Sequence, residues 1–420
     1  MNLRRTIYNS AIPFNRPLDN AHLNVTHKTR TNLFSWRGQF TPQFVESLLT
    51  TYAPEGVSVL DPFAGSGTVL LEAGLLGFSA LGFEINPAAV LLAKTYEFIN
   101  VKSNTRRSIL LSAEATLSKY IPDPLPLFNG YENMPLVKDV YMEAIHAADV
   151  PEVKLLLETF GIVVDFIGKN VHPSSMWTTW RCFKSLVESL PESDQRIQAN
   201  LGDARLLSCP DNSIDFVLTS PPYINVFNYH QYYRASAEML GWLPLNVARS
   251  EIGSNRKFRQ NRFLTVIQYC MDLSAVLYEL QRVCHDQAQI IFVVGRESNV
   301  RKTAFFNSEI IARLATESLN FNQELRQERV FSNKFGKAIY EDILHWTLPK
   351  SRRIFDDIIP MAQCIARDAL THARERVPAE ALFDLEAAIE QVEDIKMSPL
   401  LQKETIGPET LLQGYSNIST

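Results

Sequence analysis

The sequence predicts an α/β protein with a doubly wound, mostly parallel β-sheet, a helical insertion and a helical C-terminal tail. Three observations support this fold class. Residues 57–100 alternate strand and helix patterns, which is typical of parallel strands joined by helical crossovers. Strand patterns return between residues 197 and 295, and two later β-rich segments, 323–331 and 341–348, indicate the antiparallel hairpin that closes many such sheets.

Capping residues and hydrophobic periodicity predict the elements of the first hundred residues. Residues 1–35 are polar and show no period, so we expect an irregular arm. Thr41 suits an N-cap and Pro42 suits the first helical position, ahead of apolar residues three and four apart. The elements expected after this helix are a buried strand at 57–61, a helix at 68–77, a strand at 79–85 and a helix at 87–100.

Residues 101–195 interrupt this alternation and are predicted to be a helical insertion. Its helix-like stretches are 136–149, 151–167 and 174–190. Trp177 and Trp180 stand at helical spacing with Phe183 and Leu186, so we expect both tryptophans in a packed core rather than on a stacking surface.

The second half of the sheet is predicted to follow the insertion. Its expected elements are strands at 197–204, 214–220 and 289–295 and helices near 231–241, 263–284 and 307–319. After Pro349 the chain becomes helical and charged, with an apolar stripe formed by Leu382, Leu385, Ile389, Val392 and Ile395. We therefore expect a core in two segments, 1–100 and 196–349, with the insertion at 101–195 and a helical C-terminal extension at 350–420.

Composition excludes several classes of protein. The 420 residues include 41 Lys and Arg against 46 Asp and Glu; the net charge of −5 excludes nucleic-acid binding by a polycationic surface. Hydrophobic residues make up 46% and charged residues 21%, as in a folded globular protein. The five cysteines are scattered, without histidines at metal-ligand spacing, and the apolar runs are too short to span a bilayer. We expect reduced thiols, no metal and a cytoplasmic protein.

The segment DPFAGSGT at 61–68 places an acidic residue at the end of a strand and two glycines at the start of a helix. Gly65 and Gly67 allow the backbone to approach a ligand, and the helix N-terminus offers free N–H groups to an anion. The third glycine of a dinucleotide fingerprint and the lysine of a phosphate loop are absent. A ligand with a carboxylate, and an amino group for Asp61, fits this segment better than a pyrophosphate; a tight turn without a ligand is the alternative.

Two further carboxylates follow predicted strands. Glu84 ends the second strand about twenty residues after DPFAGSGT, where nucleotide-binding βαβ units place the acid that binds ribose. A solvated carboxylate at the strand end, or a cap for the helix at Pro87, is the alternative. Asp203, in the segment GDA, can accept a hydrogen bond from the exocyclic amine of an adenine, although a turn aspartate would show the same pattern.

The segment TSPPY at 219–223 ends another strand. Its consecutive prolines fix φ and donate no hydrogen bonds, so we expect a rigid loop with carbonyl oxygens facing a cleft. The Ser220 hydroxyl and the Pro221 carbonyl can accept hydrogen bonds from an amino group, while Tyr223 offers its face to a planar ring. A base held in this way must leave its stack. A proline-stiffened loop without this role is the alternative.

Together, DPFAGSGT, the Glu84 strand, GDA and TSPPY resemble motifs I to IV of the amino-methyltransferases of DNA, and HKTRTNLFSWRGQFTPQF at 27–44 resembles their motif X. These enzymes have a Rossmann-like fold and methylate the exocyclic nitrogen of cytosine or adenine with S-adenosylmethionine. The resemblance covers 27–100 and 197–348. The insertion between motifs II and III departs from the usual order of the family, which places target recognition later in the chain.

The resemblance implies a role for each matching residue. The residues that would bind the cofactor are Asp61, Phe63, Gly65, Gly67, Glu84, Asp203 and Ala204. Those that would hold the target amine are Ser220, Pro221, Pro222 and Tyr223. The implied reaction is direct in-line attack of the amine on the methyl group, without a covalent cysteine or a metal.

The serine before Pro-Pro-Tyr is typical of cytosine-N4 enzymes, so site-specific cytosine-N4 methylation of DNA is the leading hypothesis. Methylation of adenine N6 in DNA and of guanine N2 in RNA are alternatives within the enzyme class. A catalytically idle module that binds nucleic acid or a partner protein is the alternative from another class.

A basic loop after the TSPPY strand is the candidate DNA-binding segment. Its cationic residues are Arg249, Arg256, Lys257, Arg259 and Arg262. Contacts to phosphates and base edges are expected, and a solvated loop is the alternative. The expected partner is double-stranded DNA, with a restriction or defence protein as a further partner, and the oligomeric state stays open. The insertion at 101–195 is the candidate for target recognition or for binding another protein.

Overall fold

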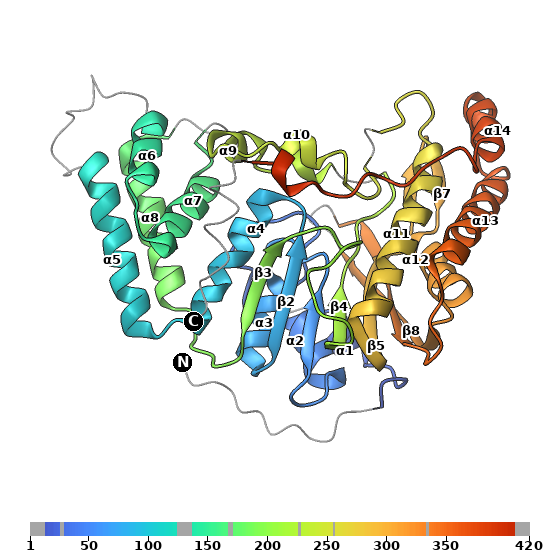
Figure 1. Ribbon diagram of the computed structural model, residues 1–420, viewed down its shortest axis with the longest axis horizontal. Helices are drawn as coiled ribbons and strands as arrows, with labels where there is room; N and C mark the ends of the chain where they lie inside the picture. Colours follow the sequence, from blue (N-terminus) through green and yellow to red (C-terminus); the bar gives the residue numbers. More distant parts are fainter. Residues whose placement is uncertain are drawn as a thin grey trace.

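The computed structural model describes residues 13–25, 29–123, 137–166, 171–225, 228–254, 257–332 and 336–407. Its centre is a seven-stranded sheet in the order β3-β2-β1-β4-β5-β9-β8, flanked by helices (Figure 1). The first five strands in this order are mutually parallel, and β9 runs antiparallel to both of its neighbours. The predicted doubly wound, mostly parallel α/β fold is therefore confirmed.

The first elements lie within two residues of their predicted bounds. Their bounds are α2 Pro42–Tyr52, β1 Ser58–Asp61, α3 Thr68–Leu76, β2 Ser79–Glu84 and α4 Pro87–Lys94, the last continued by a 3-10 turn, Thr95–Asn100. Thr41 is the N-cap residue of α2, and its backbone carbonyl accepts from Phe44 and Val45. Asn86 caps α4 with a side-chain oxygen that accepts from the backbone of Ala88 and Ala89, beside proline at the first helical position.

The second half of the sheet also matches its predicted order. The strands are β3 Ile197–Leu201, β4 Ile214–Thr219, β5 Cys284–Gly295, β8 Asn322–Ser332 and β9 Ala338–Thr347, with helices α9 Arg234–Met239, α10 Pro244–Val247, α11 Leu264–Val283 and α12 Asn307–Arg313 between them. The antiparallel β8–β9 pair confirms the predicted hairpin. A short hairpin of β6 Ser298–Val300 and β7 Thr303–Phe305 was not predicted, because three-residue strands leave no periodicity to detect.

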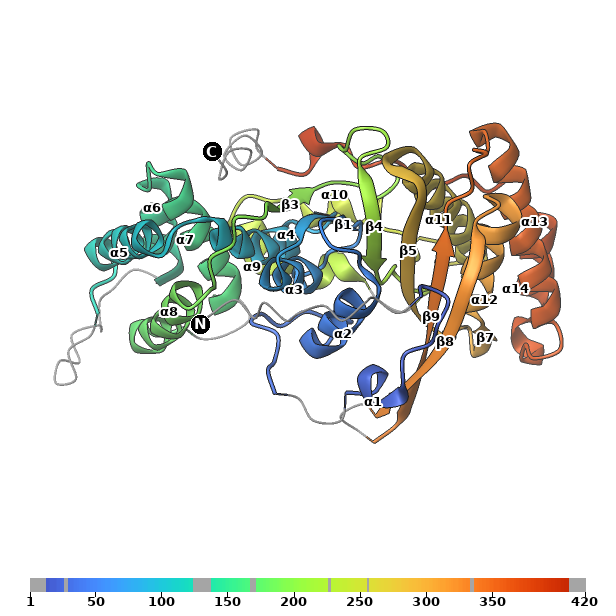
Figure 2. The same ribbon diagram turned by 90° about the horizontal axis from the view of Figure 1, so that it is seen from below.

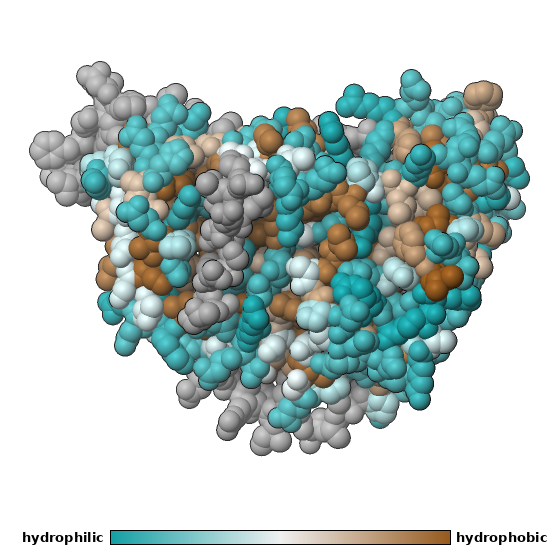
Figure 3. Space-filling view, in the orientation of Figure 1, coloured by the Kyte–Doolittle hydropathy of each residue, from teal (hydrophilic) through white to brown (hydrophobic). Residues whose placement is uncertain are grey.

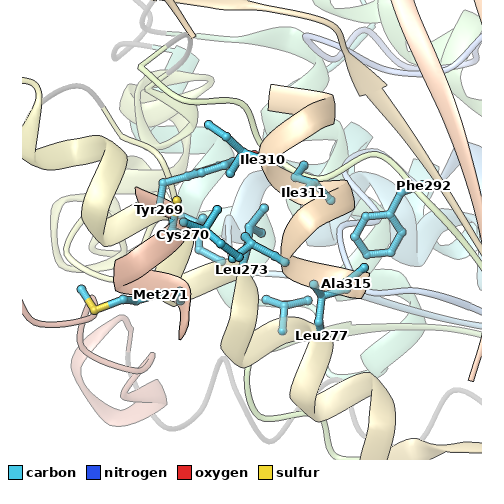
Figure 4. Packing of buried hydrophobic residues seen from close by; sticks show 14 of the residues in the cluster. Tyr269, Cys270, Met271, Leu273, Leu277, Phe292, Ile310, Ile311 and Ala315 are labelled. Carbon is cyan, nitrogen blue, oxygen red and sulfur yellow. The ribbon is translucent and has the colours of Figure 1, made fainter. Parts of the chain in front are cut away.

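Separate hydrophobic clusters cover the two faces of the sheet. Helices α11 and α12 pack on one face, where α11 side chains such as Leu273 meet Ile310 and Ile311 beside Phe292 of β5 (Figure 4). Helices α2 and α3 pack on the other face, and Figure 2 shows α1 (Asn20–Leu23) and α2 on the opposite side of the sheet from α11. Burial on both faces explains why the parallel strands are continuous apolar runs rather than alternating ones.

The insertion forms a helical cluster beside the sheet, at the left of Figure 1. Its helices are α5 Ser103–Tyr120, α6 Val137–His146, α7 Pro151–Val164 and α8 Pro173–Glu188. The three predicted stretches became α6, α7 and α8, whereas α5 was not predicted because only a narrow apolar stripe (Leu110, Ala113 and Leu117) is buried in a polar sequence. Trp177 and Trp180 lie in this core, which confirms their predicted burial.

The C-terminal extension is helical only in its first part. Helices α13 Phe355–Ala373 and α14 Leu382–Glu390 are followed by residues 396–407, which we call the C-terminal strap. The strap crosses the molecule from α14 to α10 (Figure 1), and its backbone carbonyls accept hydrogen bonds from the core. Gln268 donates to the carbonyl of Lys396 (2.9 Å) and Leu243 donates to that of Ile406 (2.8 Å). Apart from a 3-10 turn at Lys403–Thr405, the strap is not helical, so the prediction of a helical tail is wrong for the rest of it, where tertiary hydrogen bonds replace those of a helix.

Hydrophilic side chains predominate on the face of the molecule in Figure 3, with apolar ones interspersed. In the described part of the chain no helix is both long and apolar enough to cross a membrane. Across the same residues, His, Cys, Asp and Glu side chains form no group of three or more with the geometry of a metal site.

Candidate cofactor and target-base cleft

A cavity opens at the carboxyl ends of β1, β2 and β4. Strand β1 lies between β2 and β4, so the chain order reverses here, and open α/β sheets bind ligands at such switch points. The empty space, including the open mouth, is about 950 Å³. Ten predicted site residues line this cavity, and they are Asp61, Phe63, Gly65, Glu84, Asp203, Ala204, Ser220, Pro221, Pro222 and Tyr223. The structure thus brings motifs I to IV to one place.

Asp61 stands at the end of β1 with one carboxylate oxygen engaged. Its Oδ1 accepts from the Thr219 hydroxyl (2.6 Å) and from the backbone N–H of Phe63 (3.1 Å). Both hydrogen bonds that Asp61 accepts from described residues fall on Oδ1, which leaves Oδ2 for a ligand in the cavity. Burial raises the pKa of Asp61 to about 7, and the negative charge of Glu84 adds to this shift.

Glu84 ends β2 and closes the same wall of the cavity. Its Oε1 accepts from the backbone N–H groups of Ile85 and Asn86, both at 2.8 Å, and its Oε2 accepts from that of Gly65 at 2.9 Å. Burial raises the pKa of Glu84 to about 7 in spite of these donors. Two buried acids in one cavity create a site that favours a cationic ligand.

The two glycines of DPFAGSGT have different surroundings. Gly65 (φ 51°) lines the cavity under the Trp36 indole, whose ring atoms lie 3.0 Å from where a Cβ would stand. Gly67 (φ 88°) is the N-cap of α3 and lies against Tyr96 and Ala93, where a Cβ would come within 2.8 Å of the Tyr96 ring. Gly67 does not line the cavity. Its role in this structure is the close packing of α3 against α4, and a direct cofactor contact has no support.

The predicted motif X segment packs beside the cavity, and its residues Trp36 to Phe40 line it. Hydrogen bonds fix it to the DPFAGSGT loop: the Ser66 hydroxyl donates to Gln39 (2.9 Å) and the Thr68 hydroxyl donates to Asn32 (3.0 Å). His27 and Lys28 of this segment lie outside the described residues.

The Asp203 carboxylate faces an arginine rather than open space. Its Oδ1 accepts from the backbone and the Nε of Arg205 (3.0 and 2.9 Å), and its Oδ2 accepts from Arg205 Nη2 (2.7 Å) and from the backbone of Leu401 (3.1 Å). Arg205 also donates to Asp272 (2.8 Å). Asp203 thus anchors the C-terminal strap at the cavity. Its carboxylate lines the cavity, but both of its oxygens already accept hydrogen bonds from within the protein.

The TSPPY loop is held from behind by α11 and β5. The Tyr269 hydroxyl donates to the Pro222 carbonyl (3.0 Å), and the Ser220 and Tyr223 hydroxyls lie 3.4 Å apart. The Tyr223 ring lies on Gly295 at the end of β5, where a Cβ would come within 2.9 Å of it. Burial raises the pKa of Tyr223, which is therefore a neutral phenol at physiological pH.

The structure separates the five basic residues of the candidate DNA-binding loop. Arg249, Arg259 and Arg262 are exposed, as phosphate contacts require. Lys257 points inward: its Nζ donates to the carbonyl of Glu251 (2.8 Å) and to the Ser398 hydroxyl, and burial lowers its pKa to about 8. This placement does not suit a phosphate-binding lysine. Arg256 lies outside the described residues.

Several cavity residues carried no sequence signal. Tyr229 and Ser250 to Ile252 line the cavity from the chain between the TSPPY loop and α11. Glu251 was hidden within a segment whose basic charge suggested DNA binding. Tertiary contacts, among them the hydrogen bond between Glu251 and His230 (2.7 Å), 21 residues apart, turn this segment back to the cavity.

The family model that matches the chain is described as DNA methylase and covers residues 9–95. Two curated relatives are type II methyltransferases. M.BsoBI of Geobacillus stearothermophilus is 22% identical over 284 residues, which make up 54% of this chain and 56% of the relative. M.MjaII of Methanocaldococcus jannaschii is 30% identical over 95 residues, which make up 22% of this chain and 18% of the relative. The match thus spans about half of one relative and a smaller part of the other.

Two solved structures align over most of this chain. A SAM-dependent methyltransferase of Methanosarcina mazei is 13% identical, with a TM-score of 0.33 over 72% of this chain and 98% of that one. An rRNA methyltransferase of Streptomyces viridochromogenes is 15% identical, with a TM-score of 0.27 over 80% of this chain and 96% of that one. At these TM-scores neither structure bears on the activity. Over these matched stretches, the chain is similar to DNA methylases and to type II methyltransferases.

Proposed function

We propose that this protein transfers a methyl group from S-adenosylmethionine to the exocyclic N4 of a cytosine that has left its stack in double-stranded DNA. The observation that carries the proposal is the shared cavity. The buried acids Asp61 and Glu84 line it together with the Ser-Pro-Pro-Tyr loop, so a methyl donor and an acceptor amine can meet at the ends of β1 and β4.

The donor set of the cavity fits S-adenosylmethionine, the cofactor of this family. Asp61 would bind the amino group of the methionine part through its free Oδ2, and Glu84 would accept from the ribose hydroxyls through the remaining capacity of Oε2. The raised pKa values of both acids reflect buried charges that a cationic ligand would neutralise. When bound, this cofactor supplies an electrophilic methyl group on a positively charged sulfur.

The TSPPY loop would position the target amine. The Ser220 hydroxyl and the Pro221 carbonyl can accept its two N–H bonds, which draws the nitrogen lone pair out of conjugation with the ring. The face of Tyr223 would stack on the base, at a position fixed by Gly295 and by the Tyr269–Pro222 hydrogen bond. The contribution of the protein is mainly orientation of the nitrogen toward the methyl carbon.

Serine at position 220 supports cytosine over adenine, through the likeness of TSPPY to the cytosine-N4 motif. The direct test is incubation with methyl-labelled S-adenosylmethionine and DNA or RNA, followed by digestion to nucleosides. N4-methylcytosine from DNA is the expected product. Label in adenine would correct the base, label only in RNA would correct the substrate, and the absence of both transfer and cofactor binding would contradict the enzyme proposal.

Cofactor affinity is expected to rise as the pH increases through about 7. The pKa of both Asp61 and Glu84 is raised to about 7, so in the empty cavity each carboxyl is largely protonated below that pH. Because the ligand binds the ionised forms, binding below pH 7 releases protons. The affinity should therefore fall by up to about tenfold for each pH unit below 7 and for each proton released. Calorimetry of S-adenosylhomocysteine binding in two buffers of different ionisation enthalpy measures this release. An affinity independent of pH would contradict the assigned roles.

Exposed arginines of the 249–262 segment are expected to contact DNA phosphates, while Lys257 is not. Arg259→Gln should weaken DNA binding. It should also make the negative slope of log affinity against log salt concentration shallower by about one. Lys257→Gln should leave that slope unchanged, because its amine is bonded inside the protein. Anisotropy of a labelled duplex over a salt series gives both slopes. Equal loss of slope in the two variants would contradict this division.

We further propose that the 101–195 insertion recognises the target sequence. It lies beside the cavity-bearing sheet (Figure 1), and its tryptophans are committed to its own core rather than to stacking on bases. Recognition would therefore use the polar surface of its helices.

A further inference from the structure

Asp203 has no remaining capacity to bind an adenine amino group. A carboxylate offers about four acceptor positions. Four donors already occupy those of Asp203, three from Arg205 and one from the backbone of Leu401, at 2.7 to 3.1 Å. Releasing one of them would expose a buried guanidinium that is 1% accessible, and breaking a buried ion pair is costly.

Glu251 is a second carboxylate in the same part of the cavity. It lines the cavity with Ser250 and Ile252 and is 3% exposed. Its Oε1 accepts from the backbone N–H of His230 (2.5 Å) and its Oε2 accepts from His230 Nδ1 (2.7 Å). Among the described residues one donor reaches each oxygen, which leaves one acceptor position on each, so Glu251 retains the capacity that Asp203 lacks.

The backbone around Glu251 is fixed from two directions. Lys257 donates to the Glu251 carbonyl (2.8 Å), and Arg205 Nη2 donates to the Ser250 carbonyl (3.2 Å). The same Arg205 nitrogen donates to Asp203. Arg205 therefore holds Ser250, the residue before Glu251, beside Asp203. His230 is fully buried and fixes the carboxylate itself. A polar side chain held this firmly in a ligand cavity is preorganised for recognition.

We propose that Glu251, and not Asp203, accepts the hydrogen bond from the exocyclic amino group of the cofactor's adenine, with His230 as a positioning residue. This inference rests on the proposed function. Glu84 is assigned to the ribose, and Glu251 lies beside the Gly202 to Ala204 turn, where the amine was expected. Glu84 and Glu251 line the same cavity, so the ribose and the adenine of one ligand can reach both.

The test compares S-adenosylhomocysteine with its analogue that lacks the 6-amino group, by calorimetry. Wild-type protein should bind the analogue without the 6-amino group about 10- to 100-fold more weakly than S-adenosylhomocysteine, as expected for loss of a hydrogen bond to a charged acceptor. Glu251→Gln keeps the shape but replaces one acceptor oxygen by a donor, so the ratio of the two affinities should fall toward one. His230→Ala should lower the ratio partway, because the carboxylate is no longer held.

Two control variants separate recognition from folding. Asp203→Asn weakens the Arg205 ion pair and should lower the melting temperature while keeping the discrimination. Glu158→Gln changes an equally buried glutamate on α7, away from the cavity, and should keep both affinity and ratio. Circular dichroism and thermal melting confirm that each variant is folded.

The outcomes distinguish this inference from the proposed function. The role of Glu251 would be overturned if Glu251→Gln kept the wild-type ratio of the two affinities, or if only Asp203→Asn lost it. Either result would leave the methyltransferase proposal intact. A wild-type ratio near one would overturn it even if Glu251→Gln failed to fold. No binding of S-adenosylhomocysteine by the wild-type protein would contradict the proposed function itself.

Discussion

Asp61→Asn is expected to weaken binding of S-adenosylmethionine by about 100-fold or more, the largest effect on cofactor affinity that we predict. Removal of one partner from a buried charge pair costs about 3–5 kcal/mol, and each 1.4 kcal/mol is tenfold in affinity. The amide oxygen can still accept from the Thr219 hydroxyl, so the turn should keep its shape. Equilibrium dialysis with labelled cofactor measures the change.

The same substitution is expected to preserve or raise the stability of the empty protein. The pKa of Asp61 is raised to about 7 in the folded state, against about 4 for an exposed aspartate, so its ionised form destabilises the fold above that pH. Asparagine removes this unfavourable charge. A melting temperature at pH 8 that falls together with cofactor affinity would show instead that Asp61 is a structural residue. Unchanged affinity would remove Asp61 from the cofactor site.

Tyr223→Ala is expected to lower methyl transfer by about 5- to 150-fold while cofactor affinity stays within about twofold. Stacking of a base on an aromatic side chain is worth about 1–3 kcal/mol, and this contact would form only with the target base in the cleft. Because Tyr223 is a neutral phenol next to Ser220, its aromatic face rather than its charge should matter. Single-turnover transfer to DNA with saturating cofactor measures the effect.

Two further variants serve as controls for Tyr223. Tyr223→Phe keeps the ring and should retain most of the activity. Gly295→Ala places a methyl group within 2.9 Å of the same ring and should lower transfer by displacing it, although the tyrosine itself remains. Loss of cofactor binding in Tyr223→Ala would contradict a role confined to the target base, as would full activity in both Tyr223→Ala and Gly295→Ala.

Local sequence patterns predicted most of the regular elements, because helices and buried strands depend on residues close in the chain. Thr41 and Pro42 marked the start of α2, and a 20-residue segment without glycine or proline marked α11. The same patterns missed α5, whose buried stripe is narrow, and the three-residue strands β6 and β7. They also extended the C-terminal helix into the strap, because no local signal shows that Gln268 and Leu243 will take its backbone hydrogen bonds.

The motifs that carry chemistry also had local signals. Asp61 and Glu84 follow strands whose parallel order could be read, so their meeting at one sheet edge was predictable. The roles of Gly67, Lys257 and Asp203 were not predictable, because they depend on partners far along the chain. These partners are Tyr96 for Gly67, Ser398 for Lys257 and Leu401 for Asp203.

The sequence by itself determined the parallel core, the likeness to the amino-methyltransferases of DNA, and the two acids and the rigid loop that face the cavity. Spacing along strands and turns is enough to place these features. Only the tertiary structure decided which charged groups remain free to bind a ligand. That depends on lone pairs and N–H groups already used by distant residues. Arg205 and the C-terminal strap occupy Asp203, whereas His230 orients Glu251 and leaves it capacity to accept.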